Sequence, residues 1–449
     1  MKMGTRYLSF LGIGAICAWC VSRVVVAQVA APATPPSAIA VRAARMLDPK
    51  SGTIVRNAVV VVQGGNISAA GPGVAIPNGA RTIDLGDVCL LPGLIDAHTH
   101  LLQNYDGRVG GDDPNMILTV ATMSAARRAL LGAAMGREDL EAGITTVRDL
   151  GNSGWNGDVA LRDAINAGWV VGPRIVASTR ALAAAGGQFG GLAPEAQSLV
   201  QQEYVVISGV EEARRAVRQA LYDGADVIKV IVNTGPRIVS LDEMKVIVEE
   251  AKRVGKRVAA HAIGDLATRI AAEAGASSIE HAYVVPDDVL KMMADKGIYL
   301  VATDYPADAY VDGFGNGGGD DRRAALEQAK GLETRSRERL QRAVKAGVKL
   351  AFGSDEYYNV RGKTRGQASL LTLEAYQADG LSPLEVIRTA TVNAADLLGL
   401  GFRIGTIEQG KSADLIAVDG DPLKDVRELS NVRFVMKSGR VVRNDRAPY

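Results

Sequence analysis

The sequence is poor in several features that mark particular classes of protein. Its 51 Lys and Arg residues almost balance 50 Asp and Glu residues, which gives no electrostatic reason to bind nucleic acid or an anionic membrane. Beyond the N-terminus, no apolar run reaches the roughly 20 residues that a membrane-spanning helix needs. Only three cysteines occur in 449 residues, and two of them lie in the N-terminal apolar stretch. What is present, 47% hydrophobic residues, suits a globular α/β protein with a large core.

The first 27 residues have the pattern of a secretory signal peptide. Lys2 and Arg6 give a basic start, Leu8–Val21 is mostly apolar, and small residues before Gln28 predict cleavage near Ala27. The alternative is an uncleaved anchor, but the apolar stretch is short for a membrane span. We therefore expect a periplasmic or secreted protein with no stable membrane insertion after cleavage.

The mature chain then begins with a flexible leader over residues 28–37. Cleavage would remove Cys17 and Cys20 and leave Cys89 as the sole cysteine, so no intramolecular disulfide is expected even in an oxidising compartment.

The two ends of the mature chain are both rich in β-strand patterns. Residues 38–90 contain "NAVVVVQGGNISAAG", which predicts a hairpin that turns at Gly64-Gly65. Residues 400–449 contain "SADLIAVDGDP" and "VRFVMKSGRVVR", with a turn at Ser438-Gly439. We expect the two segments to form one small β-sandwich domain.

Residues 91–399 alternate between helical and strand patterns. Amphipathic runs end at a glycine and are followed by β-branched runs, as in "SLDEMKVIVEEAKRVGKRVAAHA", where Ser240 and Glu243 occupy capping-box positions. Strands are predicted at "GLIDAH", "ITTVRD", "RIVAS", "VIKVIV", "RVAAH", "SSIEH", "IYLVAT" and "VKLAFGSD". About eight strands, each followed by helical sequence, predict a (β/α)8 TIM-like barrel. A doubly wound sheet is the alternative, but no glycine-rich phosphate loop follows the first strand. The run 311–323 predicts an irregular loop.

All four histidines of the chain fall at the ends of predicted strands. His98 and His100 lie one residue apart at the tip of the first strand and point the same way, while His261 and His281 end the fifth and sixth. Asp355 follows the eighth strand. Because the C-terminal ends of barrel strands meet on one face, these side chains should converge. Histidine and carboxylate are the usual ligands of Zn²⁺, so the pattern predicts a metal site.

Lys229 lies within the fourth strand and would point into the same site. An ammonium group there is disfavoured by burial and by neighbouring cations. One interpretation is a lysine whose head reaches solvent. The other is a carboxylated lysine, an anionic carbamate able to bridge two metal ions.

These motifs together resemble the amidohydrolase superfamily. The resemblance rests on "LPGLIDAHTHL", "ADVIKV", "AHAIGD", "SIEHA", "GSD" and the tail "NAADLLGL…GTIEQGKSADLIAVDGDPL", and it covers nearly everything after residue 38. It is closest to the imidazolonepropionase-like branch, with its prolidase-type and Xaa-Arg dipeptidases and ochratoxin-hydrolysing amidases. The resemblance implies two divalent ions, Zn²⁺ by expectation: His98, His100 and Asp355 on one, His261 and His281 on the other, and carboxylated Lys229 with a hydroxide between them.

The resemblance also implies a function. We expect a hydrolase of amide or peptide bonds in dipeptides or N-acyl amino acids, including ochratoxin-type amides, in which Asp355 and Lys229 serve catalysis and Asp355 passes a proton to the leaving amine. One alternative is a cyclic-amide hydrolase or deaminase, although Gly264 stands where many mononuclear deaminases have a glutamate. A lactone or ester hydrolase and a non-catalytic assembly protein remain further alternatives.

Substrate contacts are less clear from the pattern, because two positions depart from the family. Ile263 replaces a histidine that often follows the fifth strand, and Gln188 replaces another after the third. Arg237 could pair with a substrate carboxylate or form a surface ion pair. Tyr283 and Tyr357 could bind the substrate or simply wall the pocket. As partners we expect a small amide or dipeptide substrate and further copies of the chain in a homo-oligomer.

Overall fold

The computed structural model describes residues 38–314 and 320–446. The predicted signal peptide and leader lie outside these residues. Within the described part, no helix is both long and apolar enough to cross a membrane.

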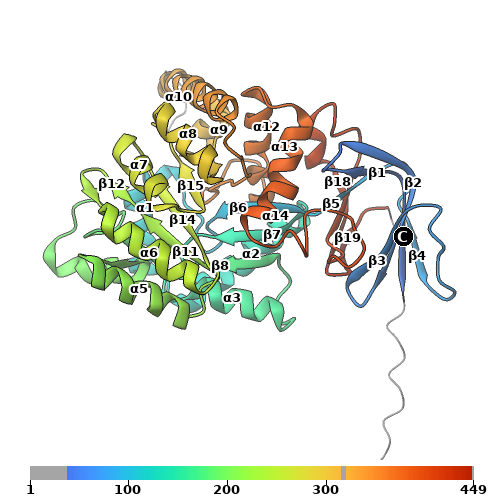
Figure 1. The fold of residues 1–449 in the computed structure, drawn as a ribbon, viewed down its shortest axis with the longest axis horizontal. Coiled ribbons are helices and arrows are strands. Elements are labelled where there is room, and N and C mark those ends of the chain that lie inside the picture. Colours follow the sequence, from blue (N-terminus) through green and yellow to red (C-terminus); the bar gives the residue numbers. More distant parts are fainter. Residues whose placement is uncertain (1–37, 315–319, 447–449) are drawn as a thin grey trace, which may run out of the picture. The chain divides into compact units, whose positions relative to one another are not determined.

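Strands from the two ends of the described chain form one mixed sheet of eight strands, blue and red in Figure 1. Its members are β1 (Ile39–Asp48), β2 (Thr53–Gln63), β3 (Asn66–Pro72), β4 (Arg81–Asp84), β5 (Cys89–Pro92), β17 (Leu415–Val418), β18 (Val432–Lys437) and β19 (Arg440–Asn444). β5 joins the two groups, because it pairs with β1 on one side and with β17 on the other. The eight strands pair as a single sheet, and the sandwich arrangement stays a prediction.

Both predicted hairpins of this sheet are present. Gly64 and Gly65 connect β2 to β3 with positive φ values of 57° and 84°, a backbone that a two-residue hairpin turn requires. Ser438 and Gly439 connect β18 to β19 in the same way. Val41, Val60 and Phe434 are among the buried side chains that pack on one another within this sheet.

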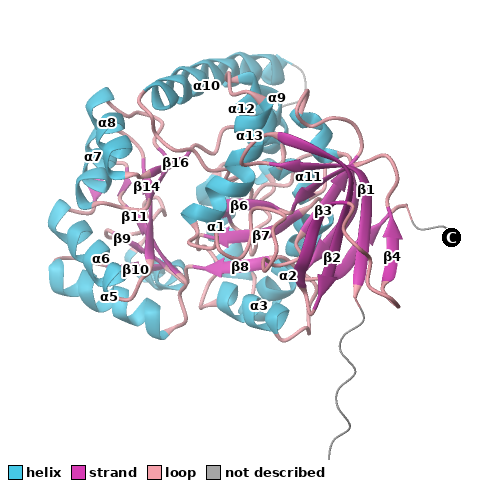
Figure 2. Ribbon diagram, turned by 45° about the vertical axis from the view of Figure 1, so that its right-hand side comes forward, coloured by secondary structure: helices cyan, strands magenta, loops and turns pink. Residues whose placement is uncertain are grey.

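The middle of the chain forms parallel strands flanked by helices (Figure 2). One sheet contains β6 (Leu94–Thr99), β7 (Ile144–Asp149) and β8 (Arg174–Ala177), and the other contains β10 (Tyr204–Val206), β9 (Ala181–Ala183), β11 (Val227–Ile231), β14 (Arg257–Ala262), β15 (Ser278–His281) and β16 (Tyr299–Val301) in that order. The helices between these strands are α2 (Ala125–Glu141), α3 (Gly157–Asn166), α5 (Val210–Tyr222), α6 (Leu241–Arg253), α7 (Asp265–Ala274) and α8 (Asp287–Lys296). The predicted alternation of helix and strand is therefore confirmed.

Local sequence explains where these helices start and stop. The Ser240 side chain accepts from the Glu243 backbone N–H while Glu243 accepts from the Ser240 N–H, so the predicted capping box begins α6. Gly275 and Gly297 end α7 and α8 in the left-handed conformation, which glycine adopts at little cost.

The predicted eighth strand differs from the expectation. Residues 347–352 form only one β-bridge, between Leu300 and Leu350, but hydrogen bonds tie this segment to two strands: Ala351 N to Leu300 O at 3.1 Å and Ala97 N to Phe352 O at 2.8 Å. The backbone is closely packed here, because a Cβ atom added at Gly353 would lie 2.7 Å from the Cβ atom of His98. The two parallel sheets also meet between β8 and β11, where Asp226 N donates to Ala177 O. Closure of eight strands into one barrel stays a prediction.

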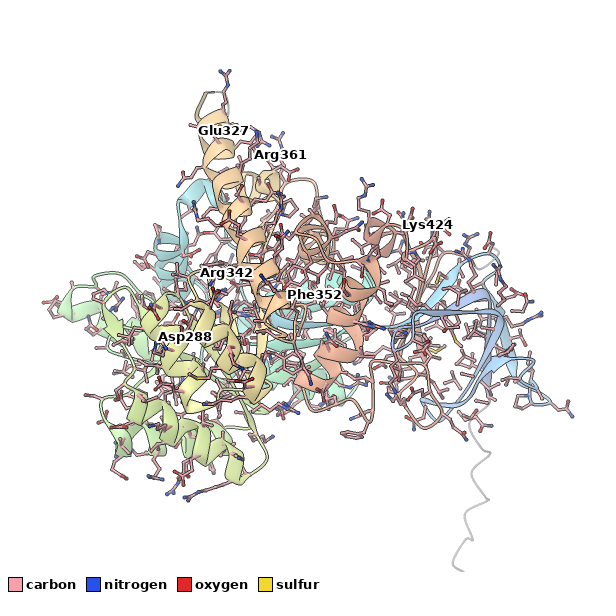
Figure 3. All side chains as sticks on the ribbon, turned by 45° about the horizontal axis from the view of Figure 1, so that its top comes forward. Asp288, Glu327, Arg342, Phe352, Arg361 and Lys424 are labelled. Carbon is pink, nitrogen blue, oxygen red and sulfur yellow. The ribbon has the colours of Figure 1, made fainter. Side chains whose placement is uncertain are left out.

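The remaining elements complete the fold. They are α1 (Asp112–Thr122), α4 (Val200–Glu203), β12 (Asn233–Thr234), β13 (Arg237–Ile238), α9 (Ala307–Phe314), α10 (Asp320–Lys345), α11 (Arg365–Ser369), α12 (Leu371–Ala378), α13 (Pro383–Arg388) and α14 (Ala394–Leu397). The prediction of an irregular loop over residues 311–323 was wrong at both ends, because residues 311–314 belong to α9 and residues 320–323 belong to α10. Phe352 is fully buried, whereas Arg361 and Lys424 are exposed (Figure 3).

Candidate metal centre

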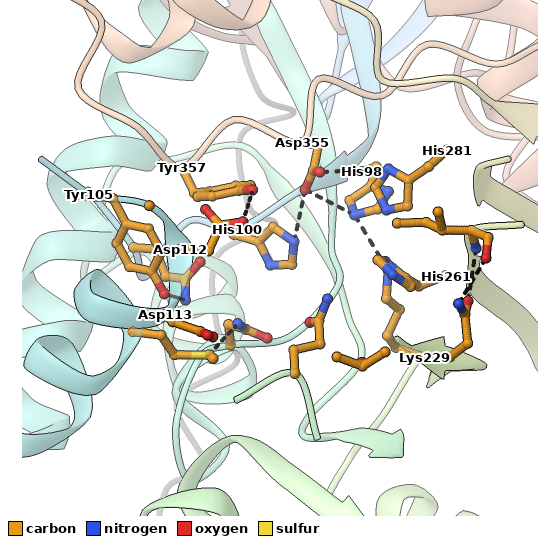
Figure 4. A pocket seen from close by; sticks show the side chains of 18 of the residues that line it. His98, His100, Tyr105, Asp112, Asp113, Lys229, His261, His281, Asp355 and Tyr357 are labelled. Atoms are coloured by element: carbon orange, nitrogen blue, oxygen red, sulfur yellow. Dashed lines mark hydrogen bonds and ion pairs between the residues drawn. The ribbon is translucent and has the colours of Figure 1, made fainter. Parts of the chain in front are cut away.

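The six residues predicted as metal ligands surround one cavity (Figure 4). They come from the C-terminal ends of β6, β14 and β15, from the middle of β11 and from the loop that follows residue 352. The strand register accounts for part of this convergence, because His261 lies beside Ile231 of β11 and His281 lies beside Ala262 of β14. The residues are His98, His100, Lys229, His261, His281 and Asp355.

Asp355 is the meeting point of three histidines. Its Oδ1 lies 3.2 Å from His98 Nε2 and 3.1 Å from His100 Nε2, and its Oδ2 lies 3.8 Å from His281 Nδ1. Ligand atoms of His98, His281 and Asp355 all lie within 4.8 Å of one another. The spacing is compatible with a shared metal ion.

Hydrogen bonds at the far side of the rings show which nitrogens face the cavity. His98 Nδ1 donates to Glu280 Oε2 at 2.8 Å, and His100 Nδ1 donates to Gly151 O at 2.8 Å. A carboxylate and a carbonyl can only accept, so each Nδ1 carries a proton and each Nε2 is the ring nitrogen that faces Asp355. With Nε2 unprotonated, two lone pairs and a carboxylate converge on one point, where a cation relieves their mutual repulsion. The donor set therefore fits a metal ion.

Burial keeps the other two histidines neutral. Burial, with a smaller contribution from nearby Lys229, lowers the pKa of His261 to about 3. Burial also holds the pKa of His281 well below its usual value, with a smaller contribution from His261. The Asp355 carboxyl is buried too, which raises its pKa, but His98 and His100 outweigh this and hold that pKa well below its ordinary value. Neutral imidazole and ionised carboxylate are the forms that bind metal.

Lys229 is the one cation of the group. Its Nζ lies 3.5 Å from His98 Nε2 inside a fully buried environment. Burial lowers the pKa of the amine to about 8, although Glu280 and Asp355 oppose the shift. At neutral pH an appreciable fraction of the amine is therefore unprotonated.

Two of the candidate ligands have a backbone conformation that is rare outside glycine. His281 has φ of 68° and Asp355 has φ of 53°. Such residues cost on the order of 1 kcal/mol each or more and persist where the surroundings hold them. His281 is held by Thr303, whose Oγ1 lies 2.8 Å from Nδ1, and Asp355 N donates to His98 O. The turn after each strand thus aims its side chain into the cavity.

A buried charge network supports His98 from behind. Glu280 binds His98 Nδ1 and also accepts from Arg148 and Ser278. Arg148, with these hydrogen bonds, lowers the pKa of Glu280 to about 2 even though burial opposes it. Asp96 accepts from His98 N and from Ser354, which ties the loop of Asp355 to β6. Sequence reasoning missed this layer, although charged residues inside short apolar strands were a usable signal.

Four of the five predicted substrate contacts line the cavity, which has a volume of about 710 Å³. Ile263 and Tyr283 are 37% and 41% exposed, and the Tyr283 ring lies 5.5 Å from that of His281. Tyr357 packs edge-on against His100. Gln188 Oε1 accepts from Tyr204 Oη at 3.0 Å. Ile263, Tyr283 and Tyr357 form an apolar and aromatic wall beside the histidines, and Gln188 adds a polar group.

Arg237 is placed differently from the expectation. It does not line the cavity, and its guanidinium donates to the backbone carbonyls of Ala185 and Phe189. It therefore shapes the loop that carries Gln188 instead of presenting a free cation to a substrate carboxylate.

The cavity also has an acidic end that the sequence patterns did not indicate. Asp112 and Asp113 line it together with Tyr105. Tyr358 Oη donates to Asp112 Oδ1 at 2.8 Å, and Gly190 N donates to Asp113 Oδ1 at 3.1 Å. No local motif marks these residues, because α1 reaches the cavity only through the tertiary fold.

Comparison with known proteins gives a consistent result. The model of the amidohydrolase family matches residues 89–442. Ochratoxinase of Aspergillus niger is 32% identical over 433 residues, which cover 89% of this chain and 85% of the relative. Imidazolonepropionase of Symbiobacterium thermophilum is 28% identical over 397 residues, which cover 82% and 85%.

Solved structures agree with the sequence matches. A Xaa-Pro dipeptidase with bound methionine in its active site superimposes with a TM-score of 0.77 and 30% identity, covering 90% of this chain and 99% of that one. The crystal structure of A. niger ochratoxinase gives a TM-score of 0.75 with 28% identity, covering 92% and 97%. These similarities support the predicted superfamily and its TIM-barrel type of α/β fold.

Proposed function

The chain belongs to the amidohydrolase family and is a hydrolase of carbon–nitrogen bonds, and we propose that it cleaves dipeptides or N-acyl amino acids, including ochratoxin-type amides. The similarity to ochratoxinase and to a Xaa-Pro dipeptidase supports this substrate class. The observation that carries the proposal is the convergence of His98 Nε2, His100 Nε2 and Asp355 Oδ1 in an accessible cavity.

Two divalent ions, Zn²⁺ by their donor set, are the cofactors we propose. His98, His100 and Asp355 would hold one, His261 and His281 the other, with carboxylated Lys229 shared between them. Bound there, such ions supply a nucleophilic hydroxide at neutral pH and polarise the scissile carbonyl. A carbamate on Lys229 would also replace a buried cation by an anion, and the lowered pKa of this amine favours its reaction with CO₂.

The protein side chains supply proton transfer and orientation. Asp355 is ionised and faces the cavity, so it can accept a proton from the attacking water and return it to the leaving amine nitrogen. Tyr283 and Ile263 would hold an apolar side chain of the substrate beside the histidines. Glu280 and Gly151 fix the tautomers of His98 and His100.

A substrate screen tests the proposal. Zn²⁺-loaded protein is incubated with a library of dipeptides and N-acyl amino acids, with lactones and carboxylate esters as a separate arm. We expect amide hydrolysis in the first arm, and none by a His98→Ala/His100→Ala variant. Hydrolysis in the ester arm alone, or in neither arm, would overturn the proposed substrate class.

The bridging role of Lys229 is tested separately. Lys229→Ala should lose turnover and hold less than the wild-type metal content, and a short carboxylic acid such as propionate should restore part of both, since it can occupy the position of the carbamate. Full turnover by the variant without added acid would refute the role.

We also propose that the protein is exported, on the strength of the N-terminal sequence alone. Mass spectrometry of the protein from the periplasmic or secreted fraction should show an N-terminus at Gln28. A full-length chain confined to the cytosol would contradict export. The homo-oligomer likewise stays a prediction, for sedimentation analysis to decide.

A further inference from the structure

A second cavity, of about 590 Å³, lies at the opposite ends of the parallel strands from the metal centre. Arg174, Val227 and Arg257, the first residues of β8, β11 and β14, line it. β14 carries Arg257 at one end and His261 near the other, and four strand residues span about 13 Å. The two cavities are therefore distinct.

The lining of this second cavity is strongly basic. Six of its side chains are cationic and one is acidic: Arg148, Arg162, Arg174, Lys256, Arg257 and Arg403 against Asp226. Arg162 and Lys256 share Asp226, Arg148 pairs with Glu280, and Arg174 pairs with Asp414. Four of the six positive charges thus have a carboxylate partner in the protein.

Arg257 and Arg403 are the two cationic side chains of the cavity without a carboxylate partner. Within residues 38–314 and 320–446, neither guanidinium has a hydrogen bond or an ion pair to a protein group. Arg257 is half-buried, and room for it depends on Gly399, where a Cβ would lie 3.2 Å from Arg257 Nε. The guanidinium nitrogens of Arg257 keep contact with solvent, so they are available to an acceptor that enters the cavity.

Two arginines of the cavity, Arg174 and Arg403, also act on Lys437 nearby. Burial, together with repulsion from Arg174, Arg440 and Arg403, lowers the pKa of Lys437 to about 8 even though Asp414 opposes the shift. Asp226, the one carboxylate among the described residues that line the cavity, is already shared by Arg162 and Lys256.

We propose that this cavity is a binding site for a small oxyanion of charge two or more, held by Arg257 and Arg403. Each guanidinium can donate two parallel N–H bonds to one phosphate group or one carboxylate group. A phosphate group places several acceptors on one centre, and a polycarboxylic acid places them on separate carbons. Both have the chemistry that the site requires.

The site is separate from the metal centre but is connected to it. Arg148 lines the second cavity and pairs with Glu280, which in turn binds the metal-ligand candidate His98. Because phosphate can also bind zinc, the test must assign binding to one of the two cavities.

Isothermal titration of the Zn²⁺-loaded full chain with inorganic phosphate, at constant ionic strength, is that test. We expect saturable binding that Arg257→Gln and Arg403→Gln each weaken by roughly tenfold or more, the loss expected for a charge-assisted hydrogen bond. The matched control is Arg127→Gln, an exposed arginine of α2 that does not line the cavity, and it should bind phosphate as the wild type does. Arg403 is exposed, so its variant keeps the test decisive if Arg257→Gln does not fold.

Further arms identify the anion. Sulfate bound in place of phosphate supports a tetrahedral oxyanion, whereas tighter binding of tricarballylate supports a polycarboxylate. Phosphate binding that is unchanged in both arginine variants would place the anion at the metal centre and overturn the proposal. Binding of chloride as tight as that of phosphate at matched ionic strength would reduce the effect to non-specific screening and overturn the proposal as well.

Discussion

At the scale of single residues, Asp355 has the most demanding position. Its carboxylate contacts His98 and His100, its backbone has a left-handed conformation, and its N–H is tied to His98 O. Asp355 therefore contributes both a fixed backbone geometry and a negative charge. Substitutions can separate these two contributions.

Asp355→Asn keeps the shape of the side chain but removes its ability to accept a proton. We expect kcat to fall by roughly 10²- to 10⁴-fold, the usual contribution of a general base. Turnover and metal content per chain are measured together, with Asp112→Asn, which lines the same cavity without touching the histidines, as the control. Turnover within a factor of ten of the wild type would contradict the assigned role.

At the scale of elements, β15 shows how one strand serves two purposes. Glu280 and His281 are adjacent, so His281 reaches the cavity while Glu280 points to Arg148 and to His98 of β6. The strand therefore carries one candidate ligand and positions another.

Glu280→Gln tests the positioning role. The amide removes the negative charge behind His98, and we expect metal affinity to fall roughly 10- to 100-fold, as for other partners of metal-binding histidines. Competition with a chelating dye measures the affinity, and Glu249→Gln on the exposed face of α6 is the control. A variant that is destabilised but binds zinc with wild-type affinity would show that Glu280 acts only on the fold.

The contact between α2 and α11 makes a pH-dependent contribution to the free energy of unfolding. Burial raises the pKa of Asp139 to about 7, although Arg365 at 3.4 Å opposes the shift. Its pKa in the unfolded chain is about 3.9, so the folded state binds the extra proton. The stability contribution is therefore complete below about pH 4 and is lost as pH rises through about 7.

Asp139→Asn should remove this term. Between pH 5 and pH 8 the wild type should lose roughly 3 kcal/mol more in its free energy of unfolding than the variant. Urea unfolding of both proteins across this range measures the difference. Parallel pH profiles would show that Asp139 is ionised in the folded protein throughout.

At the scale of the whole molecule, the metal centre brings together segments that are distant in sequence. Its candidate ligands come from four strands and a loop, spread over residues 98–355. Because the unfolded chain has no preformed site, a bound ion stabilises the folded state by mass action.

Removal of metal should accordingly lower the melting temperature. With free Zn²⁺ at roughly a thousand times Kd, the ion adds about 4 kcal/mol, and for a chain of this size that is a shift of several degrees. Calorimetry before and after chelation, followed by Zn²⁺ addition, measures it, and His98→Ala/His100→Ala should show no response. A shift of equal size in that variant would mean that zinc acts elsewhere on the protein.

The sequence by itself determined the order of elements and the set of candidate ligands. Helix caps, glycine stops and β-branched runs act over a few neighbouring residues, so they can be read without the fold. Four histidines at predicted strand ends sufficed to predict a shared site, because parallel strands in a barrel end on one face. Both terminal hairpins were predictable for the same local reason.

Only the tertiary structure decided what surrounds those ligands. The pairing of Glu280 with His98, the approach of Asp112 to the cavity and the engagement of Arg237 by backbone carbonyls join residues far apart in sequence. The eighth predicted strand forms only a single β-bridge, to Leu300, and its hydrogen bonds to Leu300 and Ala97 depend on where the fold places those residues. Likewise, only the fold brings Arg257 and Arg403 to one cavity, in which Asp226 is already shared by Arg162 and Lys256.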